Sequence, residues 1–248
     1  MPFVSSVSGT YGYGRGSRPG VITAGLQVAL TPSTYSGSGS TWDNPINSTD
    51  ATLYNTPTYS SNGFTFNGST QYAAIPSVSG ITNFTAADNY TVEVWCRIAA
   101  TQVDTVNADN SIVEKWNGGN QGAYPFVCRF IRSSTSVIFA AYNGSLNPGI
   151  SIPITTGVWI QLVGVFDHTN NIIYGYRNGS QISSGDLTIG GTISNSSVVN
   201  IGRRSNLGEG SGINYITGSV GIVRIYNTAL SAAAVLQNFN ADRGRYGI

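Results

Sequence analysis

Two glutamates lie in segments that read as β-strands, and they are the first candidates for chemistry in this chain. Glu93 lies within residues 91–98, and Glu114 lies within residues 111–116. A retaining glycosidase places a second carboxylate about 5 Å from the first, which on a strand means the same face. Neither glutamate has an acidic residue two or four positions along its strand. The sequence therefore predicts that the protein is not a glycosidase.

A nucleophile with an adjacent base is also missing from the sequence. His168 is the only histidine, it follows Asp167 in a predicted turn, and the chain has no G-x-S-x-G elbow. Neighbouring side chains in a turn diverge, so we interpret His168 as a turn residue. The glycines at 12, 14 and 16 do not stand between a strand and a helix, as a phosphate loop requires. We expect a protein that binds or assembles, and not an enzyme.

Oxygen-bearing side chains gather in residues 104–110, between two predicted strands. Asp104, Asn107 and Asp109 would supply part of the roughly six to eight oxygen ligands that Ca²⁺ takes, and backbone carbonyls could complete the set. Asp and Asn are also the ordinary residues of turns. The segment is either a calcium site or a plain turn, and the sequence indicates no other cofactor.

Aromatic residues in predicted loops and at strand ends form the third group of candidates. Sugar rings stack on exposed Tyr and Trp side chains, and subunit interfaces use the same residues as anchors. The sequence does not separate these two uses. Trp95 and Trp159 lie on predicted strands and are assigned to the core. Carbohydrate or partner contacts are predicted for Tyr35, Trp42, Tyr54, Tyr59 and Trp116.

Residues 1–20 differ in composition from the rest of the chain. They are rich in Gly, Tyr and Arg and show no hydrophobic periodicity, so this segment cannot order itself by burial. Either it is a floppy tail, or it is an arm that docks on a neighbouring subunit, and we predict the arm. Tyr rings would anchor it and Arg side chains would donate hydrogen bonds. The predicted arm contacts are Tyr11, Tyr13, Arg15 and Arg18.

Residues 21–240 read as one domain of short strands, followed by a C-terminal tail at 241–248. Asn178-Gly179 predicts a hairpin, because a type I′ turn needs positive φ twice. Residues 229–239 are the helical candidate, with Ser231 as N-cap. Period-two alternation, or an apolar run in the last case, predicts strands at 91–98, 124–131, 137–142 and 158–166.

Composition excludes several classes of protein. Only 9% of residues are charged and the net charge is +1, so the sequence does not predict electrostatic binding to nucleic acid. No apolar stretch of 18 residues exists, so no membrane span is expected, and the N-terminus shows no secretory signal.

Cys96 and Cys128 alternate in phase with apolar neighbours, so they are either two reduced core thiols or a disulfide between facing strands.

The order of these motifs resembles the laminin G-like and pentraxin branch of the concanavalin A-like superfamily. The most specific motif is Trp159 with Phe166-Asp167 and Tyr174 to Gly179, and residues 218–231 are similar to the closing strand and helix. The resemblance covers residues 21–240. It implies an all-β jelly-roll sandwich of two antiparallel sheets, with one short C-terminal helix and an extended N-terminal arm.

The front segment, including Trp42 and residues 56–68, resembles such domains in tailed-phage virion proteins. That likeness implies a non-catalytic virion component, made in the host cytoplasm. It would be a capsid decoration or a fibre, knob or tail appendage. Its partners would be other virion proteins, copies of itself, or a host-surface glycan. The alternative is a carbohydrate-binding lectin module of a secreted or cell-surface protein.

Overall fold

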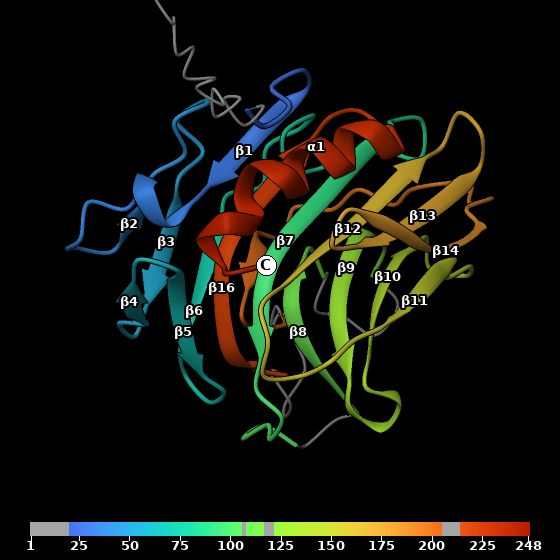
Figure 1. Cartoon of the computed structure of the whole chain (residues 1–248). Coiled ribbons are helices and arrows are strands. Elements are labelled where there is room, and N and C mark those ends of the chain that lie inside the picture. Colours follow the sequence, from blue (N-terminus) through green and yellow to red (C-terminus); the bar gives the residue numbers. More distant parts are fainter. Residues whose placement is uncertain (1–19, 106–107, 117–121, 205–213) are drawn as a thin grey trace, which may run out of the picture.

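The computed structural model describes residues 20–105, 108–116, 122–204 and 214–248, and these form two stacked antiparallel sheets (Figure 1). The elements are β1 (Leu26–Leu30), η1 (Pro32–Thr34), β2 (Thr41–Trp42), β3 (Ala51–Tyr54), β4 (Thr58–Ser60), β5 (Gly63–Asn67), β6 (Tyr72–Ile75), β7 (Tyr90–Ile98), β8 (Asp109–Glu114), β9 (Tyr124–Ile131), η2 (Arg132–Ser134), β10 (Ser136–Tyr142), β11 (Gly149–Pro153), β12 (Ile160–Asp167), β13 (Ile172–Arg177), β14 (Ser180–Asp186), β15 (Val199–Ile201), β16 (Thr217–Tyr226), α1 (Ala232–Asp242) and η3 (Arg243–Arg245).

Sheet A has the strand order β14-β13-β12-β7-β16-β5-β4, with β1 also paired to β16. Sheet B has the order β11-β10-β9-β8-β15-β6-β3-β2. Neighbours in each sheet pair antiparallel, and connections between distant strands carry the chain from one sheet to the other. The sequence-based prediction of a jelly-roll sandwich with a short C-terminal helix is confirmed.

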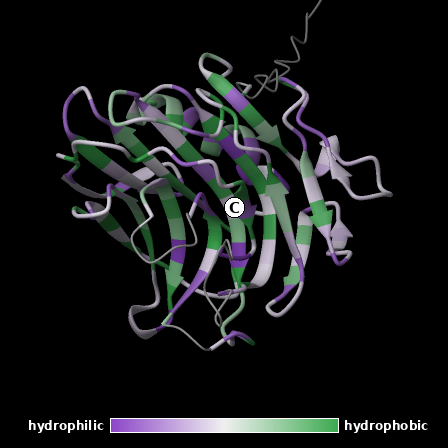
Figure 2. Cartoon of the chain, turned by 180° about the vertical axis from the view of Figure 1, so that it is seen from behind, coloured by the Kyte–Doolittle hydropathy of each residue, from purple (hydrophilic) through white to green (hydrophobic). Residues whose placement is uncertain are grey.

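Alternation along the strands places apolar residues between the sheets. In β7, Val92, Val94 and Cys96 face the main core, whereas Trp95 belongs to a separate cluster on the outer face of sheet A. Figure 2 shows hydrophobic residues recurring along the strands of both sheets. Cys96 and Cys128 both lie in the core as free thiols, and burial raises the pKa of Cys96 to about 12. The interpretation as reduced core thiols fits this arrangement.

The hairpin predicted at Asn178-Gly179 joins β13 to β14. Both residues have positive φ, 51° and 76°, as a type I′ turn requires. The structure also explains why residue 164 in β12 is a glycine, because a Cβ there would lie 2.4 Å from the Phe139 ring across the core. Both glycines are therefore required by the backbone conformation or by close packing.

Helix α1 lies across the outer face of sheet A (Figure 1). Ser231 is its N-cap, as predicted, since its Oγ accepts the Ala234 N–H at 3.2 Å. The boundary expected at residue 240 is not a structural break, because α1 continues to Asp242. Tyr246 then packs on sheet A, with its ring 4.6 Å from that of Trp95. The final residues belong to the fold.

A buried polar network fixes α1 to the sheet. Arg224 Nη1 on β16 lies 3.1 Å from Glu93 Oε1 and 2.6 Å from Asp242 Oδ2 at the end of α1. Asn238 Nδ2 donates to Glu93 Oε2 at 2.8 Å, and Gln161 Nε2 donates to Glu93 Oε1 at 2.8 Å. Glu93 is fully buried and both of its oxygens accept hydrogen bonds, so it serves the fold.

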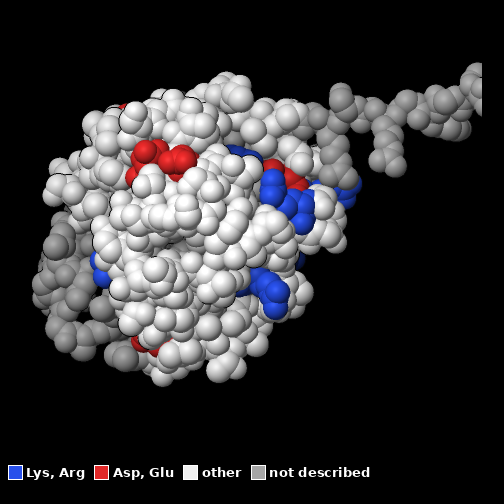
Figure 3. Space-filling model, turned by 90° about the vertical axis from the view of Figure 1, so that its left-hand side faces the viewer, with Lys and Arg blue, Asp and Glu red and all other residues white. Residues whose placement is uncertain are grey.

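Little charge reaches the surface. Figure 3 shows a largely uncharged side of the molecule with a few separate basic and acidic patches, as the 9% charged composition implies. In the part of the chain that the structure describes, no helix is long and apolar enough to cross a membrane.

Candidate functional site

Aromatic rings and guanidinium groups follow one another across the outer face of sheet B. They lie on, or directly after, strands β3, β6, β15, β8, β9 and β10, which are neighbours in that order. At roughly 4.8 Å between strands, the row extends over about 24 Å. We call it the arginine–aromatic strip, and it consists of Tyr54, Tyr72, Arg203, Arg204, Trp116, Tyr124, Arg129 and Tyr142.

One end of the strip is a stack built on a register pair. Tyr54 lies directly opposite Tyr72, and their rings are parallel within 4° with centroids 4.4 Å apart. The Arg203 guanidinium lies 3.5 Å from the Tyr72 ring centroid, a cation–π contact. Tyr54 remains 40% exposed, so its ring is available to stack on a ligand.

The other end is centred on Trp116, which is half-buried. Its ring lies 4.5 Å from the Arg129 guanidinium and 4.9 Å from that of Arg204. The Tyr124 ring follows at 5.0 Å, and Tyr142 lies 5.5 Å beyond it. Tyr124 and Tyr142 pack with Trp116 in a cluster separate from the main core.

Two carboxylates lie beneath this end and hold the guanidiniums. Arg129 Nε is 2.6 Å from Glu114 Oε2, and Arg204 Nη2 is 2.6 Å from Asp109 Oδ2. A β-bulge between Ser111 and Val113 interrupts the alternation of β8, which allows Asp109 and Glu114 to meet the same arginines. Simple alternation did not predict that these two carboxylates share a face.

Unmet hydrogen-bonding capacity is concentrated under the strip. Nine buried side-chain N or O atoms in the described residues have no hydrogen-bond partner, although such groups in folded proteins nearly always find one. Six of the nine lie on or directly after neighbouring strands here, but Arg204 Nε and Glu114 Oε1 form an ion pair with each other at 3.5 Å, so four of the six have no partner. The four atoms without a partner are Ser111 Oγ, Trp116 Nε1, Arg129 Nη2 and Asn200 Nδ2.

The predicted aromatic residues separate into three places. Tyr54 and Trp116 lie on the strip. Tyr35 lines a pocket of about 530 Å³ beside β3, together with Leu53 and Asn55, and its ring centroid lies 4.9 Å from that of Tyr59. The contact prediction for Trp42 is wrong: it is fully buried, because β2 points it into the core, and its Nε1 donates to the Thr31 carbonyl at 2.7 Å.

The candidate cation residues take part in protein contacts instead. Asp104 Oδ2 accepts the Tyr215 N–H at 3.0 Å, and Asp109 faces the guanidinium of Arg204, which repels a cation. Within the described ranges no three His, Cys, Asp or Glu residues could hold a metal. Asn107 and the predicted arm contacts Tyr11, Tyr13, Arg15 and Arg18 lie outside the described residues.

Sequence reasoning missed most of the strip. Tyr72, Arg203 and Arg204 stand at strand ends, and only the pairing of β6 with β3 and β15 reveals that they share a face. The outward phase of Arg129 within the predicted strand 124–131 was a usable signal, since a charged residue there faces away from the core.

Comparison with solved structures supports the fold. The binding domain of Paraclostridial Mosquitocidal Protein 1 matches with TM-score 0.64 and 15% identity, covering 88% of this chain and 52% of that one. Trypanosoma rangeli sialidase in complex with sialic acid matches at 0.66 and 18%, covering 90% and 34%. The botulinum neurotoxin serotype D binding domain matches at 0.66 and 10%, covering 87% and 51%. The chain thus spans a third to a half of the length of these proteins.

A comparison with curated proteins finds no match. The family model of the concanavalin A-like lectin/glucanases superfamily matches residues 67–236, which is well over half of the chain. That range includes the strands from β6 to β16 and the first turn of α1. The chain therefore belongs to the concanavalin A-like lectin/glucanase superfamily, as a lectin-like jelly-roll domain.

Proposed function

We propose that this protein is a non-catalytic carbohydrate-binding domain whose arginine–aromatic strip holds an extended glycan. The observation that carries the proposal is the run of aromatic rings and guanidinium groups on one face, above four buried polar atoms that have no partner. Apolar faces of sugar rings pack on Tyr and Trp, and sugar hydroxyls both donate and accept hydrogen bonds. Three arginines beside two carboxylates also tolerate acidic sugars.

Binding to an oligosaccharide array, followed by calorimetry on the best ligand, tests this proposal. We expect Trp116→Ala to weaken binding about tenfold or more, a change of about 1.4 kcal/mol, with Trp116→Phe retaining part of the affinity. Tyr59→Ala is the matched control, because Tyr59 is 39% exposed but lies on sheet A. If no glycan binds, or if folded Trp116→Ala binds as the wild type does, the proposal is wrong.

The absence of catalysis is part of the same proposal. Asp109 and Glu114 do share a face, but guanidiniums stand between them, and Glu114 is fully buried. Incubation with β-glucans, agar, alginate and capsular polysaccharide should therefore release no reducing ends. Release that disappears in Glu114→Gln would instead identify a glycosidase.

The setting that we propose is a bacteriophage virion, as a capsid decoration or tail appendage that meets a host-surface glycan. Support comes from the phage-like front segment, the low charge and the Gly/Tyr/Arg-rich residues 1–20. Deleting residues 1–19 should leave the circular dichroism spectrum and Tm near native but prevent assembly into oligomers or particles. Unfolding of the truncated chain, or unchanged assembly by light scattering, would contradict the docked arm.

A further inference from the structure

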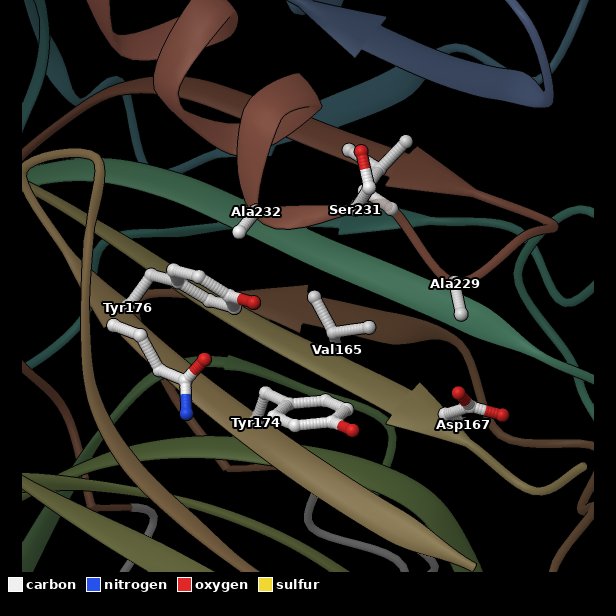
Figure 4. A pocket seen from close by; sticks show the side chains of 9 residues that line it. Val165, Asp167, Tyr174, Tyr176, Ala229, Ser231 and Ala232 are labelled. Atoms are coloured by element: carbon white, nitrogen blue, oxygen red, sulfur yellow. The ribbon is translucent and has the colours of Figure 1, made fainter. Parts of the chain in front are cut away.

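A second pocket, of about 410 Å³, opens on the outer face of sheet A, opposite the strip. It lies between the β12–β13–β14 strands and the start of α1 (Figure 4). Tyr174 and Tyr176 line one side, and Asp167, Gln181 and Ser231 contribute polar groups around them. We call it the tyrosine pocket.

The backbone dictates that both tyrosines point into this pocket. Gly175 between them faces the core, where a Cβ would lie 2.3 Å from the Ile150 side chain. Residues on either side of it therefore face outward. Figure 4 shows the two rings side by side along β13, with both hydroxyls pointing the same way and that of Tyr174 directed toward Asp167.

The polar groups of the pocket are largely unused. Tyr176 is only 3% exposed, yet no described residue hydrogen-bonds its hydroxyl, and the same holds for the Tyr174 hydroxyl and the Gln181 amide. Burial raises the pKa of Tyr176, so this hydroxyl remains a donor at neutral pH. The Asp167 carboxylate accepts from Asn170 N at 3.0 Å and Asn170 Nδ2 at 2.8 Å, which fixes its orientation.

The charge of the lining selects the ligand class. One carboxylate and no Lys or Arg line the pocket among the described residues, so an anionic sugar would be repelled. The half-buried Tyr174 ring offers stacking surface, and the two tyrosine hydroxyls, the Gln181 amide and the Asp167 carboxylate match the hydroxyls of an uncharged sugar. A groove that combines apolar surface with a few convergent polar groups is the usual form of a small-ligand site.

We propose that the tyrosine pocket binds one uncharged pyranose unit, independently of the strip on the opposite face. Taken together with the glycan site proposed for the strip, on which this second statement rests, a single chain then holds two glycans at once, one on each sheet, with an uncharged sugar at sheet A. Neither the pocket nor its ligand depends on the strip being a glycan site. Two linked sites of modest affinity would give the protein avidity for a dense glycan surface.

Saturation-transfer and ¹⁵N NMR titrations with methyl glycosides of glucose, galactose, mannose and N-acetylglucosamine test the proposal, with glucuronate as the anionic probe. We expect at least one uncharged glycoside to bind and to shift backbone signals of β13 and β14. Tyr174→Ala and Gln181→Ala should each weaken it about tenfold or more, whereas Tyr174→Phe, which keeps the ring, should lose less. Glucuronate should shift the β13 and β14 signals only after Asp167→Asn removes the carboxylate charge from the pocket.

Trp116→Ala is the control that separates the two sites, and it should leave this binding unchanged. The proposal is overturned if no uncharged glycoside binds, or if glucuronate shifts the β13 and β14 signals of the wild type equally well. It is also overturned if Tyr174→Ala and Gln181→Ala both bind the glycoside as the wild type does. Gln181 is exposed, so its replacement should not destabilise the protein. Loss of binding in Trp116→Ala alone would assign these sugars to the strip.

Discussion

Replacing Arg224 with methionine is expected to lower the free energy of unfolding by about 3–5 kcal/mol, the usual cost of leaving a buried charge without its partner. Arg224 is 3% exposed and is the cation that contacts both Glu93 and Asp242. Without it, Glu93 stays buried beneath α1 with only the neutral donors Asn238 and Gln161. Urea denaturation at neutral pH measures the loss.

Two further variants make this prediction specific. Arg97→Met changes an exposed arginine on the same outer face of sheet A and should alter stability by less than about 0.5 kcal/mol. The double variant Glu93→Gln/Arg224→Met removes both charges and should recover part of the loss. A loss below about 1 kcal/mol in Arg224→Met, or no recovery in the double variant, would mean that the network does not fix α1.

The wild type should gain about 2–3 kcal/mol of stability relative to Lys115→Met as pH rises from 7 to 10. Lys115 is fully buried, with Nζ donating to Ser77 Oγ at 2.8 Å and to the Ser197 carbonyl. Burial lowers its pKa from 10.5 to about 8. Between these two values the unfolded lysine holds its proton and the folded one does not, so stability rises with pH.

The comparison with Lys115→Met is necessary because other groups titrate in the same range. The buried thiols and tyrosines, whose pKa values are raised, reduce stability as pH rises, and they are common to both proteins. Thermal or urea unfolding of both proteins at pH 7, 8, 9 and 10 gives the difference. A difference that stays constant over this range would show that Lys115 is not held in a desolvated site.

The parts of the fold that local chemistry determines could be predicted from the sequence. The Asn178-Gly179 turn follows from positive φ, the Ser231 cap from its side-chain acceptor, and the phase of Cys96 from period two. Each depends on residues that are neighbours in sequence. The jelly-roll arrangement itself was implied by family resemblance, since strand order depends on contacts far apart in the chain.

The candidate site was less accessible to such reasoning, for two physical reasons. A β-bulge between Ser111 and Val113 brings Asp109 and Glu114 to the same arginines, and the sequence spacing of these residues does not predict the bulge. Strand β2 has too few residues to show an alternation of apolar and polar side chains, so the sequence did not predict that Trp42 points into the core. Tyr54 and Trp116 were identified by type and loop position, but their shared face depends on the pairing of distant strands.

The indole N–H of Trp116 offers the most direct test that the arginine–aromatic strip is the glycan-binding face. The chain has four tryptophans, so ¹⁵N-labelled protein gives few indole signals, and Trp116→Phe assigns the relevant one. Trp116 Nε1 has no partner among the described residues, whereas Trp42 Nε1 already donates to the Thr31 carbonyl. On titration with the best array oligosaccharide, the Trp116 signal should move with the ligand's own Kd while that of Trp42 stays in place. A Trp116 signal that does not move when the glycan binds would contradict the account.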